Sequence, residues 1–117
     1  MSVKLFLFYS FLIISQCSFQ TSIFNELNKK SKEENLIISP ISIFQILSLT
    51  SNGANGLTQE EMLKILQSSN INSLNSVNYN ILKIFKTFST VEVANAVMTK
   101  SAPEKNFAEI CKNYFAL

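Results

Sequence analysis

The side chains of this sequence that could take part in chemistry are those of serine, threonine, cysteine, glutamate and lysine. The chain contains no His, Asp, Arg or Trp. Without His or Asp, a Ser-His-Asp arrangement cannot be assembled, and a Cys-His pair is excluded for the same reason. Cys17 and Cys111 are too far apart in the sequence to predict a zinc site. We therefore expect no enzymatic activity, no catalytic residue, no metal and no cofactor.

The charged residues predict neither a phosphate site nor a nucleic-acid surface. The adjacent pairs Glu33–Glu34 and Glu60–Glu61 diverge on a loop or at a helix start, which is typical of solvated or capping charges. The sequence has no Gly-rich phosphate-binding loop, and without Arg it has no bidentate recognition of phosphate. The net charge of +2 includes no dense basic stripe, so we expect no nucleic-acid partner.

The N-terminus is typical of a secretory signal peptide. Lys4 precedes the apolar run 5–14, and Ser15-Gln16-Cys17 follows it. Cleavage after Cys17 leaves small residues at the positions that the peptidase reads, and cleavage after Ser15 is the alternative. The run is shorter than the roughly 20 apolar residues that span a membrane, so we expect no membrane anchor. A buried N-terminal helix and a lipid anchor at Cys17 are the other interpretations.

We therefore predict a signal peptide at 1–17, one structural unit at 18–117, and a secreted, extracellular product. The 117 residues are 47% hydrophobic and 15% charged, a composition that supports a packed core. Cys111 would be the one thiol of the mature chain. An odd cysteine in a secreted protein is either buried and free or paired with another molecule, and the apolar helical surroundings of Cys111 favour burial.

The first half of this unit contains start and stop signals of helices. Apolar residues at helical spacing predict a helix over 18–29, and the apolar run 36–38 predicts a buried strand. Ser39 can cap the next helix, which Pro40 can begin without losing a hydrogen bond. That helix is apolar nearly all round, which is typical of a buried helix, and its polar exceptions need partners or a wet edge. Gly53, or the residue before it, would end the helix in the left-handed conformation.

The second half predicts three more helices and a second strand. Thr58 and Glu61 form the capping box of one helix, and Ser101 and Glu104 form that of another. The fold class that follows is mixed α+β, dominated by helices. The remaining predicted segments are a loop at 67–73, an amphipathic helix over 74–88, a strand at about 90–98, and a last helix with Phe107, Ile110, Cys111, Tyr114 and Phe115 on one face.

Four pieces of the sequence, in register, resemble the opening of a serpin, the serine-protease-inhibitor family. They are the strand-to-helix junction 35–43, the helix stop Gly53-Ala54 with Gly56 and Thr58, the third helix 61–66, and the strand 93–96 before the fifth helix. The resemblance covers nearly all of residues 19–117. It implies a serpin-like fold, of which the chain holds the N-terminal helical part with two strands of otherwise missing sheets.

The resemblance also implies roles for single residues. Ser39, Ser42 and Asn95 match positions near the family's shutter, where the large central sheet opens to admit a reactive loop. Ser39 as a plain helix cap is the other interpretation, and the two roles are compatible. In some members the fourth helix binds sulfated glycans, whereas Lys83 and Lys86 alone predict an ordinary solvated face. The structural caps and turns that match the family are Pro40, Gly53, Gly56, Thr58 and Glu61.

Serpins trap serine proteases, and in some cases cysteine proteases, by offering a bait loop that inserts into the central sheet after cleavage. The resemblance places this loop and its reactive bond beyond residue 117. We therefore expect that the chain is an N-terminal fragment of an inhibitor, does not inhibit by itself, and self-associates through unpaired apolar surface. The alternatives are a short secreted, non-inhibitory binding module on a partial serpin scaffold, and a piece that pairs with a separately made remainder.

Overall fold

The computed structural model describes residues 18–31, 35–90, 92 and 94–115. The chain divides into two compact units, residues 1–44 and 45–117, and the boundary between them falls inside a helix. The predicted signal peptide at 1–17 lies outside the described residues, so the division into a signal peptide and a mature unit stays a prediction.

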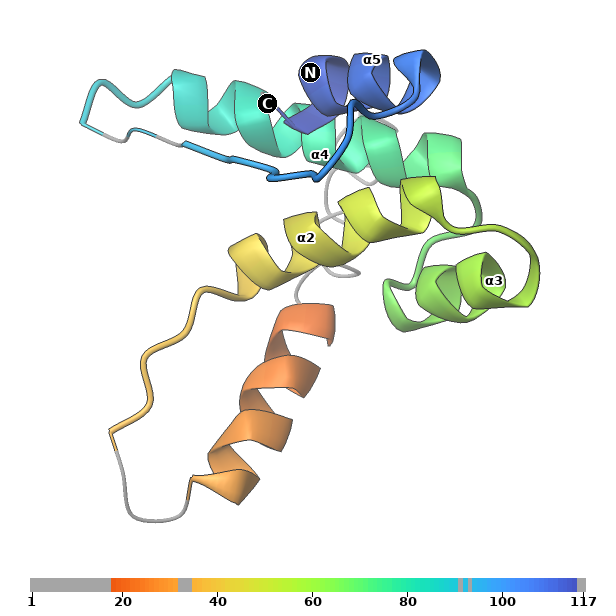
Figure 1. Cartoon of the computed structure of the whole chain (residues 1–117). Helices are drawn as coiled ribbons and strands as arrows, with labels where there is room; N and C mark the ends of the chain where they lie inside the picture. Colours follow the sequence, from red (N-terminus) through yellow and green to blue (C-terminus); the bar gives the residue numbers. More distant parts are fainter. Residues whose placement is uncertain (1–17, 32–34, 91, 93, 116–117) are drawn as a thin grey trace, which may run out of the picture. The chain divides into compact units, whose positions relative to one another are not determined.

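The regular structure of the described residues is helical (Figure 1). Residues 18–30 are helical, which confirms the helix expected over 18–29. The other helices are α2 (Pro40–Gly53), α3 (Gly56–Ile65), α4 (Ile71–Lys86) and α5 (Lys105–Phe115). Within the described part of the chain, no helix has the length and apolarity needed to cross a membrane.

The predicted α+β class is wrong, because no strand forms in the residues that the structure describes. The segments expected as strands, 36–38 and about 90–98, are irregular where they are described. A strand needs hydrogen bonds to a neighbouring strand, and neither segment lies in such a ladder. The expected burial of the first segment fails as well, since the Ile37 side chain is 95% exposed. An extended apolar pattern is therefore not sufficient here to make a strand.

The start of α2 follows the sequence prediction. The helix begins at Pro40, where the missing N–H of proline removes no helical hydrogen bond. The backbone N–H of Ser42 donates to Ser39 Oγ at 3.4 Å, and the N–H of Ile43 donates to the Ser39 carbonyl at 3.2 Å. Ser39 therefore caps α2 with its side chain and its backbone.

The start of α3 differs from the prediction. The glycine with a positive φ is Gly56, at 58°, and not Gly53. Glycine adopts this conformation without strain, so the chain turns into α3 at Gly56 itself. Asn55 is the N-cap of α3, although its side chain makes no capping hydrogen bond. Thr58 and Glu61 therefore lie inside α3, and the predicted capping box does not begin this helix.

The last two helices also begin at other residues than predicted. The helix expected over 74–88 is present as α4, and it begins at Ile71 because Asn70 Oδ1 accepts the backbone N–H of Ser73 at 2.8 Å. The box of Ser101 and Glu104 does not cap α5, which begins at Lys105. Glu104 flanks α5 instead, and its carbonyl accepts the N–H of Ala108 at 2.9 Å.

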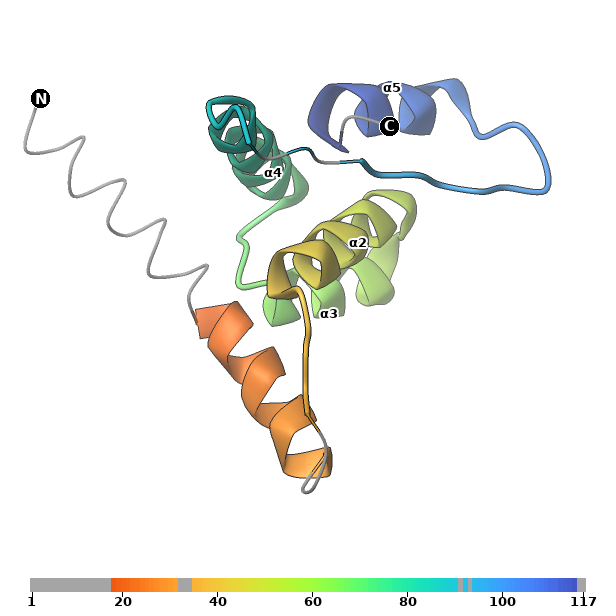
Figure 2. The same ribbon diagram turned by 90° about the vertical axis from the view of Figure 1, so that its left-hand side faces the viewer.

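Most of the buried apolar side chains of the second unit lie on α4 and α5, which contact each other (Figure 1). Figure 2 views α4 nearly end-on and α5 lengthwise. The burial of Cys111 and Phe115 confirms the apolar face predicted for α5. Burying each large apolar side chain stabilises the fold by about 1.5–3 kcal/mol. In the first unit, the rings of Phe19 and Phe44 pack edge to face with centroids 5.6 Å apart. The buried apolar side chains of the second unit are Leu66, Leu74, Leu82, Cys111 and Phe115.

Residues 45–53 of α2 belong to the second unit, and the buried side of this part of the helix is its polar side. Ile46 is 64% exposed, whereas Gln45, Ser48 and Ser51 are buried. The expectation that the apolar circumference of this helix would be covered is therefore wrong for Ile46. Among the polar exceptions, Ser42 shares a hydrogen bond with Ser39 Oγ, whereas Gln45 Nε2 is buried without a hydrogen-bond partner in the described residues.

Candidate functional site

Two of the three shutter-like residues meet in the first unit. Ser39 Oγ and Ser42 Oγ lie 2.8 Å apart, so one hydroxyl donates to the other. Because Pro40 starts the helix directly after Ser39, the two serines are separated by one helical turn. Both side chains are exposed, which leaves their remaining lone pairs open to another polar group.

The third shutter-like residue, Asn95, belongs to the second unit. Its Nδ2 donates to the carbonyl of Phe115 at 2.9 Å. This carbonyl is one of the last four of α5, which have no partner within the helix. Asn95 therefore ties the irregular segment 94–99 to the end of α5. The shutter role of the three residues stays a prediction, since they belong to separate units.

The most specific long-range contact joins α2 to α4 through two asparagines. Asn52 Nδ2 donates to Asn75 Oδ1 at 2.8 Å, and Asn75 Nδ2 donates back to Asn52 Oδ1 at 2.9 Å. Asn52 Nδ2 also donates to the carbonyl of Ser48, so both of its amide hydrogens are used. The two side chains thus form a closed amide pair between residues that are 23 positions apart.

A glutamine completes the end of α2. Gln59 Nε2, on α3, donates to the carbonyl of Ser51 at 3.0 Å and to that of Ala54 at 2.8 Å. Carbonyls at a helix C-terminus have no helical partner, so this one amide satisfies two of them at the turn between α2 and α3. Gly53, which precedes Ala54, lies near the ring of Phe107, but an added Cβ would come no closer than 3.5 Å. Glycine is therefore not required there for lack of space.

An open hollow of about 380 Å³ lies beside α5. Burial raises the pKa of the Cys111 thiol at its wall, which disfavours the reactive thiolate. Cys111 is a buried free thiol, as expected. The lining residues are Asn95, Ala96, Val97, Thr99, Pro103, Phe107, Ala108 and Cys111.

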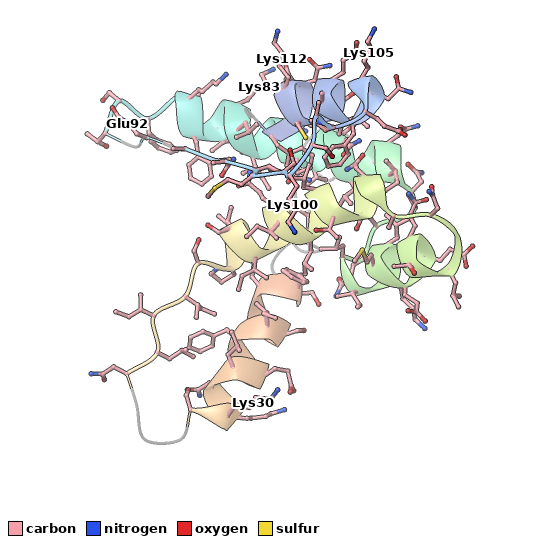
Figure 3. The ribbon with its side chains drawn as sticks, viewed as in Figure 1. Lys30, Lys83, Glu92, Lys100, Lys105 and Lys112 are labelled. Carbon is pink, nitrogen blue, oxygen red and sulfur yellow. The ribbon has the colours of Figure 1, made fainter. Side chains whose placement is uncertain are left out.

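The lysines of α4 and α5 form an ordinary solvated surface. In Figure 3, Lys83 on α4 and Lys105 and Lys112 on α5 point away from the helices that carry them. The Lys83 ammonium lies 5.4 Å from the centre of the Tyr79 ring, a contact within the range of cation–π attraction. In the described residues, no group of three or more His, Cys, Asp or Glu side chains could hold a metal ion.

Sequence reasoning did not find the amide contact between α2 and α4. A signal was present, because Gln45, Ser48 and Asn52 are polar positions three and four residues apart and so share one face of an otherwise apolar helix. Asn75 and Asn78 repeat that spacing on α4. Two polar faces of this kind on neighbouring helices indicate that the helices meet through hydrogen bonds.

Replacing Asn75 with leucine should lower the free energy of unfolding by about 1–3 kcal/mol, because the Asn52 amide loses its partner while part of it stays buried. The double variant Asn52→Leu/Asn75→Leu should recover much of this loss, since neither amide then remains unpaired. The measurement is urea unfolding at one fixed protein concentration. Asn72→Leu, on the exposed side of α4, is the control and should change the stability by less than about 0.5 kcal/mol. Additive effects of the two substitutions would contradict a direct pair.

The comparisons with known proteins agree on one family. Residues 15–117 match the family model for Serpin (serine protease inhibitor). Serine proteinase inhibitor 1 of Vaccinia virus (strain Western Reserve), of Monkeypox virus and of Rabbitpox virus (strain Utrecht) are each 48% identical to this chain over 42 residues. The aligned stretch covers 36% of this chain and 12% of each relative. No solved structure matches the chain.

The family match spans both units and includes the Ser39-Pro40 helix start and the Asn95 contact with α5. These are residues on which the resemblance to serpins rests. The match covers nearly the whole chain, which is far more than a shared motif. The chain belongs to the serpin family.

Proposed function

We propose that these 117 residues are the N-terminal portion of a secreted inhibitor of serine-type endopeptidases and do not inhibit proteases by themselves. The match of residues 15–117 to the serpin family model carries this proposal. The curated relatives are named as serine proteinase inhibitors, and the aligned stretch amounts to 12% of their length. The protease itself, of the serine or cysteine class, would be bound by a bait loop outside these residues.

The described structure supports the view that the chain alone is inactive. Inhibition in this family depends on inserting the cleaved bait loop into a sheet. The described residues contain no strand to receive it, and the segments expected as strands are irregular. Serpins inhibit rather than catalyse, so the lack of a catalytic constellation in the sequence is consistent with this role.

Incubation of the chain with trypsin-like, chymotrypsin-like and papain-like proteases should leave all three enzymes active. The bait loop is the part that forms the covalent trap, and we place it outside these residues. The measurement combines residual protease activity with electrophoresis in boiling detergent, and a complete inhibitory serpin serves as the positive control. A band stable to boiling that contains both the chain and the protease would contradict the proposal.

We further propose that the product is secreted after loss of residues 1–17. The support is the sequence pattern of Lys4, the apolar run 5–14 and the small residues that follow. Expression with the native N-terminus in a secreting cell should yield an extracellular chain whose mass corresponds to a start at Ser18, or at Gln16 if cleavage follows Ser15. Replacing two residues of the apolar run with lysine should abolish export. A cell-retained chain of unchanged mass would overturn the proposal.

We expect the mature chain to self-associate. Met98 is 97% exposed in the irregular segment 94–99, and Ile37 is nearly as exposed in the segment before α2. Apolar side chains on extended backbone without a paired neighbour favour association with another chain. Sedimentation velocity over a range of concentrations should show dimers or larger species, and Met98→Lys should shift the distribution toward monomer. A monomer at every concentration would contradict this expectation.

The alternative function, a non-inhibitory binding module, is favoured by one observation. The hollow beside α5 is open and is lined mainly by apolar side chains, as small-molecule sites are. A chain that is monomeric in the sedimentation measurement and binds a ligand there would favour the module over the inhibitor fragment.

A further inference from the structure

α2 and α4, which the Asn52–Asn75 pair joins, carry one buried hydrogen-bond donor and one buried acceptor without a partner in the residues that the structure describes. Gln45 on α2 is 6% exposed, and Asn78 on α4 is 0% exposed. Gln45 Nε2 and Asn78 Oδ1 are both buried, and neither makes a hydrogen bond to another described group. Leaving such atoms unpaired in a folded protein is costly, so each of them requires a partner.

The two side chains lie on the same side of the Asn52–Asn75 pair. That pair fixes where the helices meet, and α2 and α4 run in roughly opposite directions (Figure 1). Gln45 precedes Asn52 by two helical turns, and Asn78 follows Asn75 by one turn. Because the helices run in opposite directions, Gln45 and Asn78 are displaced from the Asn52–Asn75 pair toward the same end of the contact.

The orientation of the Asn78 amide is determined by a second contact. Asn78 Nδ2 donates to the carbonyl of Leu74 at 2.9 Å, one turn earlier on the same helix. The Asn78 oxygen is therefore directed away from that carbonyl and is left to accept a hydrogen bond from another group. Gln45 Nε2 can only donate, so the two atoms present opposite requirements to a molecule between the helices.

These requirements select a small neutral molecule. A cation would be repelled by the amide hydrogens of Gln45, and an anion by the carbonyl oxygen of Asn78. Water satisfies both atoms because its oxygen accepts one hydrogen bond while its own hydrogen donates another. Globular proteins contain about one buried water per 27 residues, typically at otherwise unpaired polar atoms.

We propose that the contact between α2 and α4 is an internal water-binding site, in which one water molecule, or a chain of two, links Gln45 Nε2 to Asn78 Oδ1. The site adds to the direct Asn52–Asn75 pair and makes the whole contact depend on directed hydrogen bonds.

Water bound at this site is observable in the unmodified chain. Magnetisation transfer from water to the side-chain amide protons of Gln45 and Asn78, in a ¹⁵N-labelled sample at mildly acidic pH, should report a residence time longer than that of surface water. The side-chain amide of Asn72, on the exposed side of α4, should report only brief contacts. Brief contacts at all three amides would overturn the proposal.

Substitution gives a second test, in which the melting temperature should change in opposite directions for a hydrated site and a dry one. Gln45→Met and Asn78→Leu nearly preserve volume and remove the amide groups. At a hydrated site each variant should lower the melting temperature by on the order of 5 °C, and the double variant should lose less than the sum, because both partners belong to the same water. Higher melting temperatures that add in the double variant would show that the atoms were dry and unpaired.

If a variant does not fold, the transfer measurement on the unmodified chain decides. A native chain without a cooperative transition would contradict the packed contact on which the site depends.

Discussion

The mutual exchange of hydrogen bonds between Asn52 and Asn75, at 2.8 and 2.9 Å, fixes the position of α2 against α4. Apolar packing tolerates sliding, because dispersion contacts have little directional preference. Two amides that exchange hydrogen bonds are satisfied in one relative position only, and a shift of either helix leaves buried polar groups unpaired. The contact therefore specifies position more than it adds stability, which is the best-attested role of buried polar pairs between helices.

Further contacts join the rest of the second unit. Gln59 on α3 donates to the carbonyls of Ser51 and Ala54 at the end of α2. On the other side, α4 packs against α5, and Asn95 ties the segment before α5 to its last turn. The contacts of Gln59 and Asn95 each use a side-chain amide on a backbone carbonyl at the end of a helix.

There is a physical reason why the described residues of this serpin-family chain form helices and no strand. Helices close their hydrogen bonds within one segment, so a short stretch of a family fold can form them alone. A strand closes its hydrogen bonds only with another strand, which a short stretch of the fold need not contain. The chain aligns with 12% of the length of its curated relatives, and the segments at 36–38 and 94–99 have the apolar character of strands without a strand beside them. The helical half of the family pattern is therefore present, while the residues that would form sheet remain irregular.

The sequence by itself determined features that depend on neighbours along the chain. The absence of His and Asp excludes a catalytic triad whatever the fold is. The start of α2 at Ser39-Pro40, the closeness of Ser39 to Ser42 and the buried face of α5 follow from local spacing, and the structure has all three. The predicted caps of α3 and α5 were wrong, because α3 already begins at Gly56, before Thr58, and α5 begins only at Lys105, after Glu104.

Only the tertiary structure decided which side of α2 is buried. An apolar helix can cover any part of its circumference, and the neighbour that selects the side, α4, begins 18 residues after α2 ends. Gln45 and Ser48 are buried and Ile46 is exposed, and Asn75 of α4 pairs with Asn52 on α2. The polar spacing on each helix indicated a polar face, but the pairing of Asn52 with Asn75 was decided only once both helices were in place.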